Sequence, residues 1–217
     1  MKYSKLPTGG VGPISNWYDR RVLPRVIDLV CGSKIFDSQR KDLLRGLSGN
    51  VLEIGFGSGT NLPYVPASVS SYFAVEPSID ALNLSAAKSY ESGQLYRIAA
   101  SGDRLPIRSG SIDFVLFSFV LCSVDDPLRV IEECARVLKP AGEVRFVEHG
   151  RSINNSMARV QRLLDPIEMA VAGNCRLSRV PLEYFDEQLW MGVEGGEAYL
   201  GPASPWTYVY RSRYKKR

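Results

Sequence analysis

Alternate glycines flanked by acidic residues are the feature of this sequence with the clearest chemistry. The segment VLEIGFGSG carries Glu53 and then glycines at three alternate positions, Gly55, Gly57 and Gly59. Glu76 follows the next apolar run, YFAV. A glycine has no Cβ, so the backbone turns tightly there and lies close against a ligand. We therefore expect the glycine loop to hold a flat, polar ligand.

The spacing and the charge of this loop restrict the class of nucleotide. Dinucleotide-binding folds use the pattern GxGxxG and place a pyrophosphate at a helix N-terminus, but Thr60 occupies the position of the last glycine here. Glu53 would repel a pyrophosphate and suits a cationic amino group. S-adenosylmethionine (SAM) carries an ammonium and no phosphate, so it fits better. A nicotinamide-dependent oxidoreductase stays the less favoured alternative.

Apolar strands that alternate with helices must position these residues. Apolar runs predict strands at 51–54, 72–78 and 95–101, one that ends near 117, and one at 143–149. Helices are predicted over 17–30 and 40–47, from Ser78, over 125–137, over 157–172 with a break at Pro166, and over 182–189, with a turn at LKPAGE. MGVEGGEAYLG and PWTYVYRSRY predict two antiparallel strands at one sheet edge. The order predicts an α/β fold with a doubly wound, mostly parallel sheet.

Such a sheet predicts where distant residues meet. Ligands of doubly wound sheets bind at the carboxyl ends of the strands, near the point where the strand order reverses. We therefore expect five segments to converge: Gly55–Gly59, Glu76, Ser101–Asp103, Ser118–Cys122 and Glu148–His149.

Several longer motifs resemble the class I SAM-dependent methyltransferases with a type 11 methyltransferase domain. The similarity covers residues 48–150 through VLEIGFGSG, AVEP, LPIRSGSIDFV and RVLKPAGEVRFVEH. FVLCSV, VEHG, LLDP and GNCRLSR resemble the branch that includes membrane-associated alkyl thiol S-methyltransferases, which extends the likeness to residue 180. The resemblance implies a Rossmann-like, seven-stranded sheet with an antiparallel C-terminal strand, together with an N-terminal helical lid.

The resemblance also implies roles for individual residues. Gly55, Gly57 and Gly59 would line the methionine portion of SAM, and Glu53 would hold its ammonium directly or through water. Glu76 would accept hydrogen bonds from both ribose hydroxyls, which suits the two acceptor oxygens of a carboxylate. Further cofactor contacts are expected from Asn61, Pro77, Ser101, Gly102, Phe119 and, as part of the lid, Tyr18.

Two departures from the family leave alternatives open. Many relatives have an aspartate beside the adenine where Ser101 stands here, so adenine is read by Ser101, by backbone groups near Gly102, or by Asp103. The thiol-methylating relatives also carry an N-terminal membrane segment that this sequence lacks, which leaves its substrate and location open.

One histidine is the leading candidate for acid–base chemistry. Methyl transfer needs alignment of donor and acceptor, and a weakly acidic acceptor gains from a base. His149 stands at the end of a predicted strand beside Glu148, which could orient it, although a packed, hydrogen-bonded histidine is the alternative. Asp165 is a second candidate base for which a turn or capping role is favoured.

Composition bounds the remaining possibilities. The 217 residues suit one domain over 1–217, with an arm and lid over 1–35, a SAM-binding core over 48–150 and acceptor-side helices and strands over 151–217. The net charge of +4 is modest, so no nucleic-acid partner is expected. The four cysteines form no CxxC pair, so neither a zinc site nor a disulfide framework is expected. We expect cytoplasmic residence, because the sequence has no signal peptide and no apolar run of about 18 residues.

Together these features predict a SAM-dependent methyltransferase that acts on a small, apolar acceptor and releases S-adenosylhomocysteine without a metal. A thiol is the favoured acceptor. O-, N- or C-methylation of a quinone, lipid or other metabolite stays open, as does a non-catalytic SAM-binding module. Peripheral membrane contact and the oligomeric state are also left open.

Overall fold

The computed structural model describes residues 22, 23, 25, 26 and 33–217. The predicted lid helix over 17–30 lies mostly outside these residues, as does Tyr18. The lid therefore stays a prediction.

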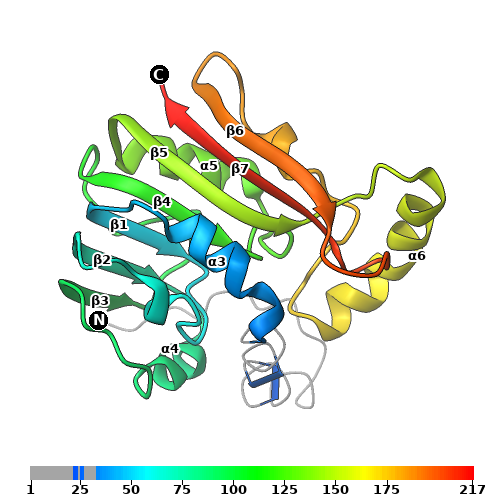
Figure 1. Ribbon diagram of the computed structural model, residues 1–217, viewed down its shortest axis with the longest axis horizontal. Coiled ribbons are helices and arrows are strands. Elements are labelled where there is room, and N and C mark those ends of the chain that lie inside the picture. The colour runs from blue at the N-terminus through cyan, green and yellow to red at the C-terminus, as the bar shows by residue number, and fades with distance from the viewer. Residues whose placement is uncertain (1–21, 24, 27–32) are drawn as a thin grey trace.

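A seven-stranded sheet forms the centre of the molecule (Figure 1). Its strands are β1 (Gly49–Ile54), β2 (Val69–Val75), β3 (Gln94–Ile98), β4 (Ile112–Ser118), β5 (Leu138–His149), β6 (Trp190–Tyr199) and β7 (Tyr208–Lys216). The order is β3-β2-β1-β4-β5-β7-β6. Strands β1 to β5 pair in parallel, and β7 runs antiparallel to both β5 and β6. This confirms the predicted doubly wound fold, whose order reverses between β1 and β4.

The α-helices that lie wholly within the described residues are α3 (Asp37–Leu44), α4 (Ile79–Ser85), α5 (Pro127–Val137) and α6 (Asn155–Val171). Short 3₁₀ helices cover η2 (Lys34–Phe36), η3 (Leu62–Tyr64) and η4 (Pro181–Tyr184). Side chains of Ser78, Asp126 and Asn154 accept hydrogen bonds from first-turn amides of α4, α5 and α6, so local capping sets these starts. None of the helices in the described part of the chain has the length and apolar character needed to span a bilayer.

Side chains along the parallel strands point alternately to the two faces of the sheet and form two hydrophobic cores. Val51 and Leu116 face the cluster that includes α3, whereas Leu52 and Phe117 face the cluster that includes α5. Neighbouring strand residues point to opposite faces, and helices cover both faces, with α3 in front of the sheet and α5 behind it in Figure 1. The continuous apolar runs are therefore explained by burial on two sides.

Three local predictions need correction. LKPAGE is a bulge within β5, because Leu138 pairs with Ile112 and Glu143 with Phe114. Helix α6 continues through Pro166, which is exposed, so the ring meets solvent and the missing N–H costs only one helical bond. The predicted helix over 182–189 is only the short η4, because the chain turns extended at Phe185.

Candidate functional site

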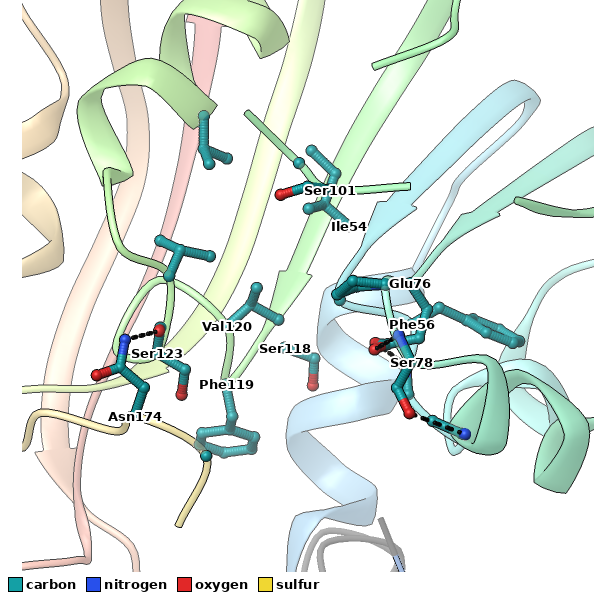
Figure 2. Close-up of a pocket in the computed structure, with 18 of the residues that line it drawn as sticks. Ile54, Phe56, Glu76, Ser78, Ser101, Ser118, Phe119, Val120, Ser123 and Asn174 are labelled. Carbon is teal, nitrogen blue, oxygen red and sulfur yellow. Dashed lines mark hydrogen bonds between the residues drawn. The ribbon is translucent and has the colours of Figure 1, made fainter. Parts of the chain in front are cut away.

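A cavity of about 460 Å³ opens at the carboxyl ends of the parallel strands. Its size falls in the range of small-ligand pockets. Loops after β1, β2, β3 and β4 line it, together with Leu23 and the segment after α6. In Figure 2, Glu76 and Ser78 lie across the open space from Ser123 and Asn174. The predicted residues that line the cavity are Glu53, Gly55, Gly57, Glu76, Pro77, Ser101, Gly102 and Phe119.

The three glycines of the loop after β1 serve different purposes. All have positive φ, which disfavours any other residue. A Cβ at Gly55 would lie 2.4 Å from a methyl group of Val120, and one at Gly59 would lie 2.8 Å from the Phe56 ring. At Gly57 a Cβ would meet nothing closer than 4.0 Å, so it would enter the cavity. Gly57 therefore keeps space free for a ligand, whereas Gly59 permits packing and does not line the cavity.

Glu53 is a buried carboxylate at the floor of the cavity. Its two oxygens accept hydrogen bonds from the Asn61 side-chain amide at 2.6 Å and from the Tyr72 hydroxyl at 2.7 Å. Burial raises the pKa of Glu53 to about 7, against the opposing effect of these donors and of Arg40. Asn61 is fully buried and does not line the cavity, so it positions Glu53 rather than facing a ligand. A cationic group beside Glu53 would favour its ionised form.

Glu76 is held at the end of β2 by two backbone amides. One oxygen accepts from the Gly57 amide and the other from the Ser78 amide, each at 2.9 Å. Each carboxylate oxygen keeps a further acceptor site, so the group can accept two more hydrogen bonds from a ligand. Burial raises the pKa of Glu76 above its ordinary value, while the two amides oppose the rise.

The loop after β3 forms the third side of the cavity. Ser101, Gly102 and Asp103 all line it. A Cβ at Gly102 would lie 2.6 Å from a methyl group of Ile54, so close packing on β1 explains this glycine. All three residues are therefore placed to contact a ligand in the cavity.

The loop after β4 is shaped by a buried acid. Phe119 has φ 60°, an unusual conformation for a large side chain. Glu148 accepts hydrogen bonds from the amides of Val120, Leu121 and Cys122 at 2.7, 3.0 and 3.4 Å. Its oxygens are thus directed to this loop, which identifies it as a support for the loop. Burial raises the pKa of Glu148 to about 7.

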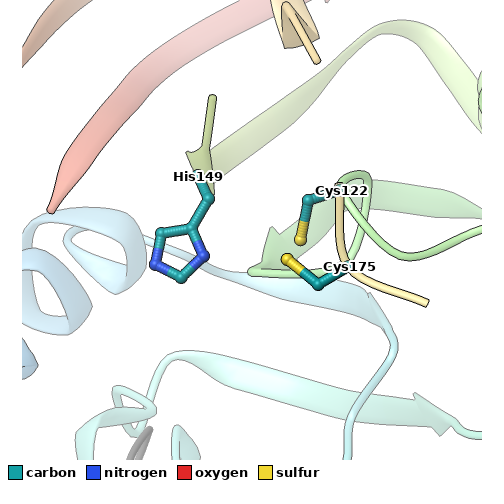
Figure 3. Close-up of side chains that lie close together, drawn as sticks. All are labelled: Cys122, His149 and Cys175. Atoms are coloured by element: carbon teal, nitrogen blue, oxygen red, sulfur yellow. The ribbon is translucent and has the colours of Figure 1, made fainter. Parts of the chain in front are cut away.

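His149 lies behind the cavity wall rather than in it. Its ring is 4.6 Å from the Phe119 ring between centroids, and Phe119 itself lines the cavity. The sulfur atoms of Cys122 and Cys175 lie within 4.8 Å of a ring nitrogen of His149 (Figure 3). A hydrogen bond with Cys175 and burial raise the pKa of Cys122 well above its ordinary value, so Cys122 is no thiolate nucleophile as it stands.

The segment after α6 was the least expected part of the site. Ala172, Gly173 and Asn174 line the cavity, and the Asn174 amide donates to the Ser123 carbonyl at 2.8 Å. Asp165 accepts from the amides of Leu177 and Ser178 and from the Ser178 hydroxyl, which gives it a structural role in this segment. The only signal in the sequence was the GNCRLSR motif, whose family likeness did not say what it contacts.

Comparison with known proteins agrees with this geometry. Residues 52–146 match the family described as "Methyltransferase domain". The chain is 34% identical over 149 residues to thiol S-methyltransferase TMT1B of Rattus norvegicus, an alignment that covers 65% of this chain and 60% of the rat protein. The chain thus spans about 60% of the length of that relative.

Solved structures share the fold. The methyltransferase in the complex with the Haloferax volcanii Trm112 methyltransferase activator superposes with a TM-score of 0.69 at 14% identity, covering 95% of this chain and 99% of that one. The plantazolicin methyltransferase BpumL, solved with S-adenosylhomocysteine, gives a TM-score of 0.57 at 15% identity, covering 94% and 89%. Residues 52–146 thus match a methyltransferase domain, and the chain as described shares the fold of these solved methyltransferases.

Proposed function

We propose that this protein transfers the methyl group of SAM to a small, apolar acceptor, with a thiol as the favoured acceptor. Bound SAM would supply a methyl group already activated by its sulfonium. The protein then has to hold the donor, align the acceptor and exclude competing water.

The pair of acids in one cavity is the observation that carries the proposal. Glu53 at the floor suits the ammonium of SAM, and Glu76 suits its ribose diol. Gly57, which has no side chain, leaves space in the cavity for the ligand. These three features match a cationic, phosphate-free nucleoside and would disfavour a pyrophosphate.

The thiol acceptor is supported by similarity to the rat thiol S-methyltransferase, and an apolar acceptor by the cavity wall. The cavity lining includes the apolar side chains of Leu23, Phe119 and Val124, which suit an apolar acceptor. His149 sits directly behind Phe119 and is proposed to help remove the acceptor proton. Oxygen, nitrogen and carbon acceptors remain the second candidate because nothing in the cavity is selective for sulfur alone. We also propose that the protein resides in the cytoplasm, which cell fractionation would test.

Methyl transfer is tested by measuring S-adenosylhomocysteine formation with matched thiols, phenols and amines. We expect turnover with apolar thiols and much weaker turnover with the phenol and amine of the same carbon skeleton. Glu76→Gln should weaken SAM binding, because an amide offers one acceptor oxygen in place of two. SAM binding without turnover for any acceptor would favour a non-catalytic SAM-binding module. Binding of a nicotinamide dinucleotide in preference to SAM would overturn the proposal.

A further inference from the structure

Two cysteines and the histidine form a compact cluster beside the cavity. The ligand atoms of Cys122, His149 and Cys175 all lie within 4.8 Å of one another. Both cysteines are buried and His149 is half-buried. Figure 3 shows one ring nitrogen of His149 directed toward the two sulfur atoms. The three residues come from the loop after β4, the end of β5 and the segment after α6, so only the fold brings them together.

This set of donors matches a thiophilic divalent cation. Two cysteines and one histidine are a known ligand set for catalytic zinc, which keeps its fourth position open. Zinc–sulfur bonds of about 2.3 Å and zinc–nitrogen bonds of about 2.0 Å place tetrahedral ligand atoms roughly 3.5 to 3.8 Å apart. Closing from 4.8 Å or less to that separation takes a shift of about 1 Å, within the reach of side-chain rotation.

Hydrogen bonds hold the backbone around the cluster in place. The Arg176 amide donates to the Cys122 carbonyl at 2.9 Å, which ties the two cysteine-bearing segments together. The Arg179 guanidinium donates to two further carbonyls of the loop after β4, at 2.6 and 2.7 Å. Asp165 fixes the far side of the same segment through its hydrogen bond from the Leu177 amide at 2.7 Å. A preorganised ligand frame of this kind lowers the cost of binding an ion.

The cluster lies next to the part of the cavity wall that Phe119 forms. Phe119 lines the cavity and contacts the His149 ring. Ser123, which follows one cysteine, and Asn174, which precedes the other, also line the cavity. Phe119 therefore contacts both the cavity and the cluster, and its side chain has to move aside for an acceptor to reach the cluster.

We propose that Cys122, His149 and Cys175 bind a zinc ion whose fourth coordination position takes the sulfur of the thiol acceptor. This inference rests on the proposed function for its substrate but not for the metal site itself. Zinc displaces the thiol protons of both cysteines, and the acceptor thiol loses its proton to solvent as it binds. Its sulfur then forms a bond to the methyl carbon of SAM while the carbon–sulfonium bond breaks. The electron pair of that bond stays on the sulfur of S-adenosylhomocysteine, and the thioether leaves the metal.

The proposal changes the role of His149 and departs from the sequence expectation of no zinc. A ring nitrogen bound to zinc cannot also accept the acceptor proton, so the metal takes over the activation of the thiol. Cys134 provides an internal control, because it is also a buried free cysteine but belongs to α5 and packs in the core, outside this cluster.

The metal site is tested without any need for turnover. The full chain is purified under reducing conditions, reconstituted with zinc and desalted, and its zinc content is measured by mass spectrometry. We expect about one zinc ion per chain, and with cobalt in its place, an absorption band from thiolate-to-cobalt charge transfer. Cys122→Ala, Cys175→Ala and His149→Ala should lose the metal, whereas Cys134→Ala should keep it. His149→Cys, which restores a ligand, should regain it, which separates a lost ligand from a misfolded chain.

The second part of the test measures how fast the thiol is methylated. Removing zinc with a chelator should slow thiol methylation about 100-fold or more while SAM binding persists. The metal site would be refuted if the reconstituted wild type contained no zinc, or if Cys122 and Cys175 formed a disulfide instead. Equal thiol methylation with and without bound zinc would overturn the acceptor role of the metal. Zinc binding with no S-adenosylhomocysteine from any acceptor would instead refute the proposed function and leave the metal site standing.

Discussion

Lowering the pH from 7.0 to 5.5 should weaken SAM binding about 16-fold through the protonation of Glu53. Burial raises the pKa of this carboxyl to about 7, and only the ionised form attracts the SAM ammonium. The apparent dissociation constant then scales as one plus ten to the power of pKa minus pH, which is about 33 at pH 5.5 and about 2 at pH 7.0. The ratio corresponds to about 1.6 kcal/mol. The α-amino group of SAM, with a pKa near 8, stays charged throughout this range.

The assay is a calorimetric titration of SAM and of 5′-methylthioadenosine at several pH values between 5.5 and 7.0. Methylthioadenosine keeps the ribose and adenine but lacks the ammonium. Its affinity therefore reports any titration of Glu76, whose pKa burial also raises. The difference between the two ligands in how steeply the dissociation constant depends on pH isolates the effect of Glu53.

Glu53→Gln provides the matched variant. Its carbonyl oxygen can accept from the Tyr72 hydroxyl, and its amide can donate to the Asn61 side-chain oxygen, which has no partner among the described residues. The variant should fold, bind SAM less tightly at pH 7.0 and lose the extra pH slope. Equal slopes for SAM and methylthioadenosine in the wild type would refute the assignment of the ammonium to Glu53.

The unfolding free energy of the ligand-free protein should fall by about 3 kcal/mol between pH 4.5 and 7 on account of Glu53. The pKa of Glu53 is raised from 4.5 to about 7 in the folded protein. The stabilisation by its protonated form is therefore complete below pH 4.5 and is lost as the pH rises through 7. Urea unfolding of the wild type and of Glu53→Gln at both pH values measures this difference. Gly55→Ala should destabilise the protein by about 2–4 kcal/mol, because its Cβ meets Val120 at 2.4 Å, and Val120→Ala should restore part of the loss in thermal melts. Gly57→Ala should cost only about 1 kcal/mol but weaken SAM binding more than tenfold in the same titration, since its methyl group would enter the cavity; unchanged affinity would contradict that placement. Glu148→Gln should cost about 1–3 kcal/mol and speed amide hydrogen exchange in the loop after β4, and unaltered exchange would argue against its supporting role.

The sheet and the donor side of the site were predictable because their signals are local. Each parallel strand is a short apolar run, and Glu76 and Ser101 follow such runs directly. The rule that parallel strands present their carboxyl ends at one edge then places these residues together. Local signals failed where tertiary packing overrides them. Pro166 has a low helix propensity but lies inside α6, and the residues after Tyr184 leave the helical conformation.

The sequence by itself determined the alternation of strands and helices, the glycine loop and the class of the methyl donor, because spacing, charge and apolar periodicity act over a few residues. Only the tertiary structure separated Gly57, which faces the cavity, from Gly59, which packs against Phe56. It also directed Glu148 to the loop after β4 and gathered Cys122, His149 and Cys175. Contacts between such distant segments depend on which strands are neighbours and how the loops pack, and no spacing along the chain encodes that.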